Sequence, residues 1–97
     1  MISNLEKAII ESNYYLYLVK NNINHYGHRA TTLTGFHLAR MYLQIVNKII
    51  THNDVDVKYK DVYEFNMIKY KQLRLIYINS GYSHKVDKNI HGGIKNE

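Results

Sequence analysis

The sequence predicts a small, mostly α domain of three helices. Two stretches of the 97-residue chain repeat apolar residues at steps of three and four, which is the period of a helix face. A third stretch begins with a helix-capping pattern, and the chain contains no Pro that would interrupt a helix. A length of 97 residues fits one domain rather than two. We expect a single compact domain over residues 1–82 and a polar, loose tail over residues 83–97.

The first predicted helix spans residues 4–22. Ser3 and Glu6 have the spacing of a capping box, in which the hydroxyl and the carboxylate each satisfy a free backbone N–H group. An apolar face follows at helical steps, through Leu5, Ile9, Ser12, Leu16, Val19 and Ile23. We expect the helix to end in a stretch of residues that are typical of helix ends, namely Asn21, Asn22, Asn24 and Gly27.

The second predicted helix, residues 33–52, has the clearest pattern. Its wide apolar face consists of two neighbouring seams, Phe36, Ala39, Leu43, Val46 and Ile50 with Leu38, Tyr42, Ile45 and Ile49 beside them. The opposite face is polar and carries His37, Arg40, Gln44, Lys48 and Thr51. Residues 24–35 are expected to form a connector whose threonines cap this helix.

The last third of the chain allows two interpretations. Asp61 and Glu64 repeat the capping spacing and favour a third helix over residues 61–79. Residues 54–60, however, alternate polar and apolar side chains, and residues 72–78 include several β-favouring ones. The alternative to three helices is therefore an α+β fold of two helices and a C-terminal β-hairpin.

The composition argues against several kinds of site. The chain has no Cys, which removes disulfides, thiolate chemistry and zinc sites built on Cys. His25 and His28 have an H-x-x-H spacing without a nearby Asp or Glu, so we expect no metal site. No Gly-rich phosphate loop is present, and so short a chain rarely builds a deep cleft. We therefore expect neither enzyme activity nor a cofactor.

The location of the protein is predicted from two absent patterns. The start of the sequence lacks a basic segment followed by an apolar one, as a secretory signal would have. No apolar run approaches the roughly 20 residues of a membrane-spanning helix. We expect a cytoplasmic protein without a membrane partner.

The strongest functional indication is a long segment without acidic residues. The chain has a net charge of +5, and no Asp or Glu occurs between Glu11 and Asp54. Cations that face no acids attract phosphates, and a Tyr ring can stack on an unpaired base. We expect the connector and the polar face of the second helix to bind nucleic acid or a nucleic-acid-containing machine such as a ribonucleoprotein. The candidate residues are His25, Tyr26, His28, Arg29, His37, Arg40, Gln44 and Lys48.

The ten tyrosines support a different function. One small core does not easily accommodate all of them, and exposed Tyr is enriched at protein interfaces. The alternative is a protein-binding inhibitor or adaptor that blocks a host enzyme, for example an anti-CRISPR type of inhibitor, and that can form a homodimer. The candidate interface residues are Tyr14, Tyr15, Tyr17, Tyr63, Tyr70 and Tyr77.

The composition also suggests a source for the protein. Phe, Tyr, Met, Ile, Asn and Lys, whose codons are rich in A and T, fill about half of the chain. This bias and the small size favour an accessory or regulatory protein of a phage or mobile element.

Overall fold

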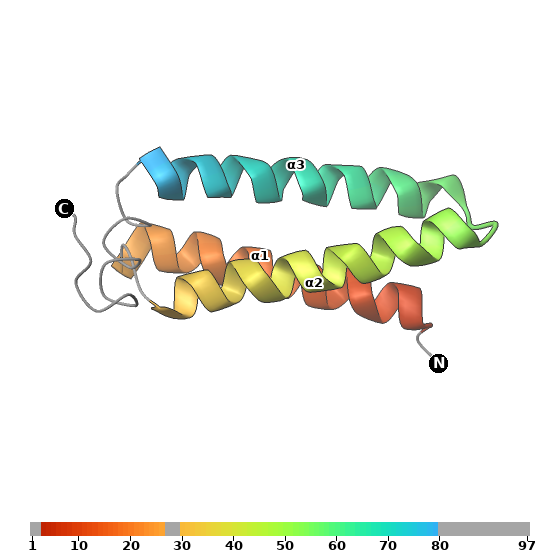
Figure 1. The fold of residues 1–97 in the computed structure, drawn as a ribbon, viewed down its shortest axis with the longest axis horizontal. Helices are drawn as coiled ribbons and strands as arrows, with labels where there is room; N and C mark the ends of the chain where they lie inside the picture. The colour runs from red at the N-terminus through yellow and green to blue at the C-terminus, as the bar shows by residue number, and fades with distance from the viewer. Residues whose placement is uncertain (1–2, 27–29, 80–97) are drawn as a thin grey trace.

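Three α-helices of equal length make up the part of the protein that the structure describes. The computed structural model describes residues 3–26 and 30–79. The helices, of 23 residues each, are α1 (Asn4–Tyr26), α2 (Ala30–His52) and α3 (Val57–Asn79). Their directions alternate, so the start of α1, the α2–α3 turn and the start of α3 lie at one end of the bundle (Figure 1). The predicted three-helix fold is confirmed.

The alternative with a β-hairpin is wrong, because α3 contains residues 57–60 and 72–78 in one continuous helix. The tail predicted for residues 83–97 lies outside the described residues.

The capping box at the start of α1 is confirmed. The Ser3 backbone N–H donates to Glu6 Oε1 at 3.2 Å, and the Glu6 backbone N–H donates to Ser3 Oγ at 3.1 Å. The expected end of this helix is wrong, because α1 continues to Tyr26. Asn22 is tolerated in the last turns because it is buried against α2, where its Nδ2 donates to Thr31 Oγ1 at 3.5 Å.

The threonines expected to cap the second helix instead lie inside it. α2 already includes Ala30, and Thr34 Oγ1 donates to the Ala30 carbonyl at 3.2 Å. Thr32 is fully buried on the core side of the helix. The main apolar seam of α2 is buried as predicted, at Phe36, Ala39, Leu43, Val46 and Ile50. In the second seam Leu38, Tyr42 and Ile49 are half-buried and Ile45 is exposed.

The start of α3 differs from the prediction by four residues. Asp56 caps the helix, because its Oδ1 accepts from the Lys58 backbone N–H and its carbonyl from the Tyr59 backbone N–H, both at 3.0 Å. The spacing of Asp61 and Glu64 is therefore that of two residues inside a helix, and the capping predicted for them is wrong. Residues 54–60 alternate polar and apolar side chains as a strand does, but they form the α2–α3 turn and the first turn of α3.

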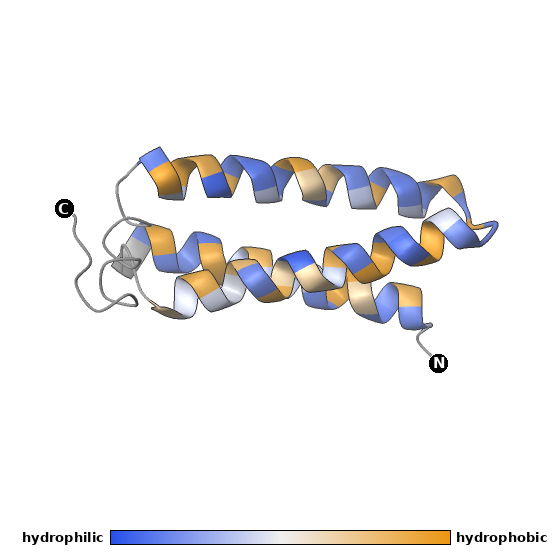
Figure 2. Ribbon diagram, viewed as in Figure 1, coloured by the Kyte–Doolittle hydropathy of each residue, from blue (hydrophilic) through white to orange (hydrophobic). Residues whose placement is uncertain are grey.

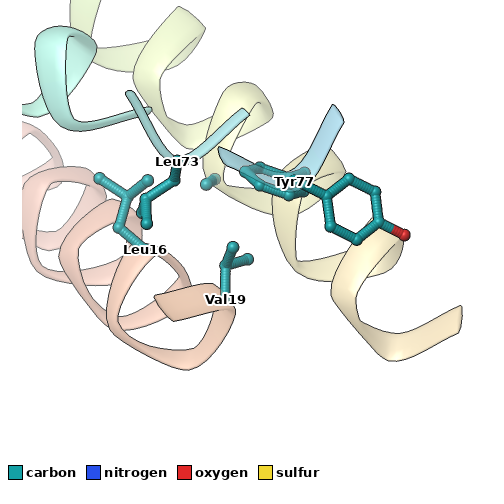
Figure 3. Packing of buried hydrophobic residues seen from close by; sticks show 6 residues of the cluster. Leu16, Val19, Leu73 and Tyr77 are labelled. Carbon is teal, nitrogen blue, oxygen red and sulfur yellow. The ribbon is translucent and has the colours of Figure 1, made fainter. Parts of the chain in front are cut away.

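The core consists of two apolar clusters along the bundle, to which all three helices contribute. One cluster joins Leu16 and Val19 of α1, Phe36 and Ala39 of α2, and Leu73 and Tyr77 of α3 (Figure 3). The other, nearer the α2–α3 turn, is built on Leu5, Ala8, Val46 and Ile50. Hydrophobic positions recur along every helix, and on α3 they alternate closely with polar ones (Figure 2).

A buried polar pair and a close helix contact fix how the helices meet. Between the clusters, Asn66 Nδ2 donates to Ser12 Oγ at 3.5 Å, and Ser12 Oγ donates to the Ile9 carbonyl at 2.8 Å. At Gly35, a Cβ atom would lie 2.7 Å from Val19 Cγ2. Gly35 therefore lets α2 approach α1 more closely than any other residue would.

Candidate functional site

The fold separates the charges of the described chain along the bundle axis. Divided at the helix midpoints, the half away from the α2–α3 turn comprises residues 15–26, 30–41 and 68–79. We call it the acid-free half, because its described residues include five Lys or Arg side chains and no Asp or Glu. The five are Lys20, Arg40, Lys69, Lys71 and Arg74.

The opposite half, which we call the turn half, holds every acidic residue that the structure describes. These are Glu6, Glu11, Asp54, Asp56, Asp61 and Glu64. They outnumber the lysines of this half, Lys7, Lys48, Lys58 and Lys60. The positive charge of the described bundle is therefore concentrated in one of its halves.

The predicted nucleic-acid site did not include α3, which contributes Lys69, Lys71 and Arg74 to this surface. The predicted acid-free segment ended before Asp54, yet the sequence also lacks acids between Glu64 and Asp87. Because α1 and α3 run in the same direction with α2 antiparallel between them, the second acid-free stretch meets the first at the same end of the bundle (Figure 1). The signal was present in the sequence, but its position depended on the fold.

Two arginines flank a hollow between α2 and α3. The hollow has a volume of about 240 Å³ and is lined by Leu33, Phe36, His37, Arg40, Tyr70 and Arg74. The Arg74 guanidinium lies 5.2 Å from the centre of the Phe36 ring, which itself packs edge-on against Tyr70 at 5.8 Å. A cation over an aromatic face is stabilised there, so Arg74 is held in place beside the hollow.

Two lysines of the same half flank a second hollow, between α1 and α3. This hollow, of about 370 Å³, is lined by Asn13, Leu16, Tyr17, Lys20, Lys69, Gln72, Leu73 and Ile76. Lys69 Nζ lies 5.0 Å from the centre of the Phe65 ring, while Lys20 and Tyr17 are exposed. The acid-free half thus has cations on two of its interhelical sides.

The structure brings together only part of the predicted nucleic-acid site. His37 and Arg40 are exposed in the acid-free half, next to Arg74. Gln44 and Lys48 are exposed on the same helix, but both belong to the turn half, so the polar stripe of α2 crosses the charge boundary.

The other four candidates are not placed as side chains. His25 and Tyr26 belong to the last turn of α1, but their side chains lie outside the described part of the chain. His28 and Arg29 lie outside it altogether.

The six predicted interface tyrosines do not share one surface. Tyr14 and Tyr17 are exposed, with 54% and 69% of their surface accessible, whereas Tyr63 and Tyr70 are half-buried. Tyr77 is fully buried in the core, so the exposed position expected for it is wrong. It lies one turn after Leu73 on the stripe of α3 that faces the other helices.

Tyr15 has a structural role in the bundle. Its ring stacks on that of Tyr42 with the centroids 5.9 Å apart, and it packs in a T-shaped arrangement with the Tyr14 ring, whose centroid is 5.1 Å away. Desolvation raises the pKa of Tyr15, with further increases from Tyr42, Glu11 and Tyr14. The Tyr15 ring therefore links α1 to α2.

Within residues 3–26 and 30–79, no group of three His, Asp or Glu side chains could hold a metal ion. None of the three described helices is both long and apolar enough to cross a membrane.

Comparison with protein-family models, with curated proteins and with solved structures gives no match.

Proposed function

We propose that this chain is a non-enzymatic binding module that docks on nucleic acid through the acid-free half of its bundle. The observation that carries the proposal is the separation of charge, with five cations and no acid in the described part of one half. The composition suggests an accessory protein of a phage or mobile element. In that role the module would bind nucleic acid or a ribonucleoprotein.

The arrangement suits phosphates better than it suits a small substrate. Each phosphate that a Lys or Arg neutralises releases condensed counterions, which is the main source of affinity in binding that does not depend on sequence. Arg40 and Arg74 flank one hollow from two different helices, so they could contact neighbouring phosphates of one backbone. No acidic side chain of the described acid-free half would offset their charge.

An exposed ring beside the cations favours single strands. Tyr17 is 69% exposed and lies one helical turn before Lys20, and both residues border the hollow between α1 and α3. An aromatic ring next to a backbone-binding cation is the arrangement on which unpaired bases stack. We therefore propose single-stranded DNA or RNA as the preferred ligand.

The test is a fluorescence-anisotropy titration of the full chain with labelled single- and double-stranded DNA and RNA. The variant Arg40→Glu with Lys71→Glu changes two exposed cations of the acid-free half. The control, Lys7→Glu with Lys60→Glu, makes the same change in net charge at two exposed lysines of the turn half. We expect the first pair to lower the affinity at least about tenfold more than the control. Absence of binding at low salt, or equal losses in both variants, would overturn the proposal.

A second candidate function is a protein-binding inhibitor or adaptor of a host enzyme. The observation in its favour is the exposure of Tyr14 and Tyr17, because exposed Tyr is a frequent anchor of protein interfaces. Under this alternative, Tyr14→Ala with Tyr17→Ala would abolish retention of a host enzyme in a pull-down, whereas Arg40→Glu with Lys71→Glu would not.

A further inference from the structure

The side of the bundle between α1 and α3 carries a groove in two parts. The part in the acid-free half is the hollow of about 370 Å³ described above. The part in the turn half has a volume of about 330 Å³ and is lined by Glu6, Ile9, Ile10, Lys58, Tyr59 and Val62. The two hollows follow the same pair of helices, one after the other.

Large apolar side chains are exposed along this groove. Ile10 and Ile76 line the two hollows and are 52% and 51% exposed. Val62 lines one part of the groove and Lys69 the other, and Phe65 lies between them on α3, about one turn from each. Its side chain is 62% exposed. Together with Tyr17 they form an apolar strip that a monomer leaves in contact with water. Strips of this kind mark interaction surfaces.

The charges in and beside the groove are positive at one end and mixed at the other. Lys20 and Lys69 border the part in the acid-free half. Glu6 lines the part in the turn half, and Asp61 lies on α3 one turn before Phe65. Lys58 also borders this part and offsets one of the two acids. The groove is thus basic at one end and weakly acidic at the other.

We infer that a second copy of the chain covers this groove, with the two bundles antiparallel. A two-fold axis perpendicular to the helices brings the same patch of both copies together, which is the commonest geometry of homodimers. It would place Lys20 and Lys69 of one copy against the end that carries Glu6 and Asp61 in the other. A parallel copy would instead bring like charges together, which opposes association.

Other occupants fit the groove less well. A nucleic acid bound along the whole groove would meet the carboxylate of Glu6 in the turn half, which opposes its phosphates. A strongly acidic peptide would likewise be repelled at one end. A dimer of this kind leaves Arg40 and Arg74 accessible for the proposed function, because they border the α2–α3 hollow and not this groove. It would cover Tyr17 and Lys20, so the preference for single strands that rests on these two residues applies to the monomer.

The first experiment measures the mass of the full chain by sedimentation equilibrium over a range of concentrations. The variant Phe65→Glu with Ile76→Glu changes two residues of the groove. The control, Ile68→Glu with Leu75→Glu, changes two residues of α3 that are similarly exposed, at 56% and 58%. They lie on a different stripe of the helix from Val62, Phe65, Lys69 and Ile76, and so away from the groove. We expect a dimer that the groove variant weakens more than about tenfold, since buried apolar anchors dominate the affinity of interfaces. The control should remain a dimer with the same helical content by circular dichroism.

The second experiment tests the charges. Lys20→Glu with Lys69→Glu should weaken the dimer, because both ends of each groove would then be acidic. Adding Asp61→Lys to that variant should restore much of the affinity. Glu6 is left unchanged because it belongs to the cap of α1.

The third experiment tests the orientation of the copies. The chain has no Cys, so Asn24→Cys gives a single site for a spin label near the end of α1. In an antiparallel dimer the two labels should lie roughly 25 Å or more apart along the axis, at 1.5 Å of helix rise per residue. Labels in close contact would contradict the antiparallel arrangement. A monomer at all concentrations, or a dimer that Phe65→Glu with Ile76→Glu leaves intact, would overturn the inference.

Discussion

Glu6 is the residue whose environment most directly predicts a pH effect. Its pKa is lowered by the hydrogen bond from the Ser3 backbone N–H, then by those from the Ser3 hydroxyl and the Tyr59 hydroxyl, the latter at 3.3 Å. A carboxylate whose pKa is lower in the folded state stabilises the fold at pH values above its unfolded pKa, near 4.5. This stabilisation is lost as the pH falls through the folded pKa.

We therefore expect Glu6→Gln to destabilise the protein at pH 7 and to have a progressively smaller effect as the pH falls below 4.5 towards 3. Urea unfolding of the native chain and the variant at pH 7 and pH 3 measures the difference. Glu64→Gln serves as the control, because Glu64 is exposed on α3 of the same half. An equal loss in the control, or a loss from Glu6→Gln that is undiminished at pH 3, would contradict the role assigned to Glu6.

The residue that caps α3 provides a second prediction. Because Asp56 Oδ1 accepts from the Lys58 backbone N–H, Asp56→Ala should lower the free energy of unfolding by about 1 kcal/mol. Asp61→Ala should change it by less than about 0.5 kcal/mol, because Asp61 is an exposed residue inside the helix. Thermal unfolding of both variants distinguishes them. The reverse order would show that the helix starts at Asp61, as its spacing to Glu64 had suggested.

At the scale of the helices, Gly35 determines how closely α1 and α2 approach. A methyl group at this position would meet Val19 Cγ2 at 2.7 Å, and Val19 is fully buried and has a stiff, β-branched side chain. Gly35→Ala should therefore cost about 1–3 kcal/mol, although Ala favours helix by about 1 kcal/mol over Gly. Urea unfolding measures this loss.

A second variant tests whether the cost of Gly35→Ala comes from steric overlap with Val19. In a background of Val19→Ala, which removes the overlapping methyl group, Gly35→Ala should cost much less or become stabilising. The same cost in both backgrounds would show that the effect does not come from the contact with Val19.

The helices differ in how far the sequence could predict them. α2 was predicted well because its buried residues are all apolar apart from Thr32 and Gly35, and they fall on one seam. On α3 the buried side includes Asn66 and Tyr77, whereas Leu75 and Ile76 are exposed. Hydrophobicity therefore does not identify the inner face of α3, and the burial of Tyr77 could not be predicted without knowing how the helices pack.

At the scale of the whole molecule, only a small part of the candidate site could be predicted, since Arg40 is the one cation of the described acid-free half that was a predicted site residue. The acid-free segment between Glu11 and Asp54 was visible in the sequence because it is continuous. The partnership of Arg40 with Arg74 was not visible, because it requires that α3 return along α2. Because of the same topology, Lys48 lies in the turn half, together with the described acidic residues.

The charge separation makes a last prediction, about the dependence of binding on salt. The logarithm of the affinity for single-stranded nucleic acid falls with the logarithm of the salt concentration, by about 0.7 for each phosphate neutralised. If Arg40 and Lys71 each neutralise one phosphate, Arg40→Glu with Lys71→Glu should reduce this slope by about 1.4. Lys7→Glu with Lys60→Glu should leave it unchanged, although the net charge of the two variants is the same. Anisotropy titrations at four or more salt concentrations give both slopes. If the affinity of the first variant falls without a change in slope, Arg40 and Lys71 do not contact phosphates, and their effect comes from the structure around them.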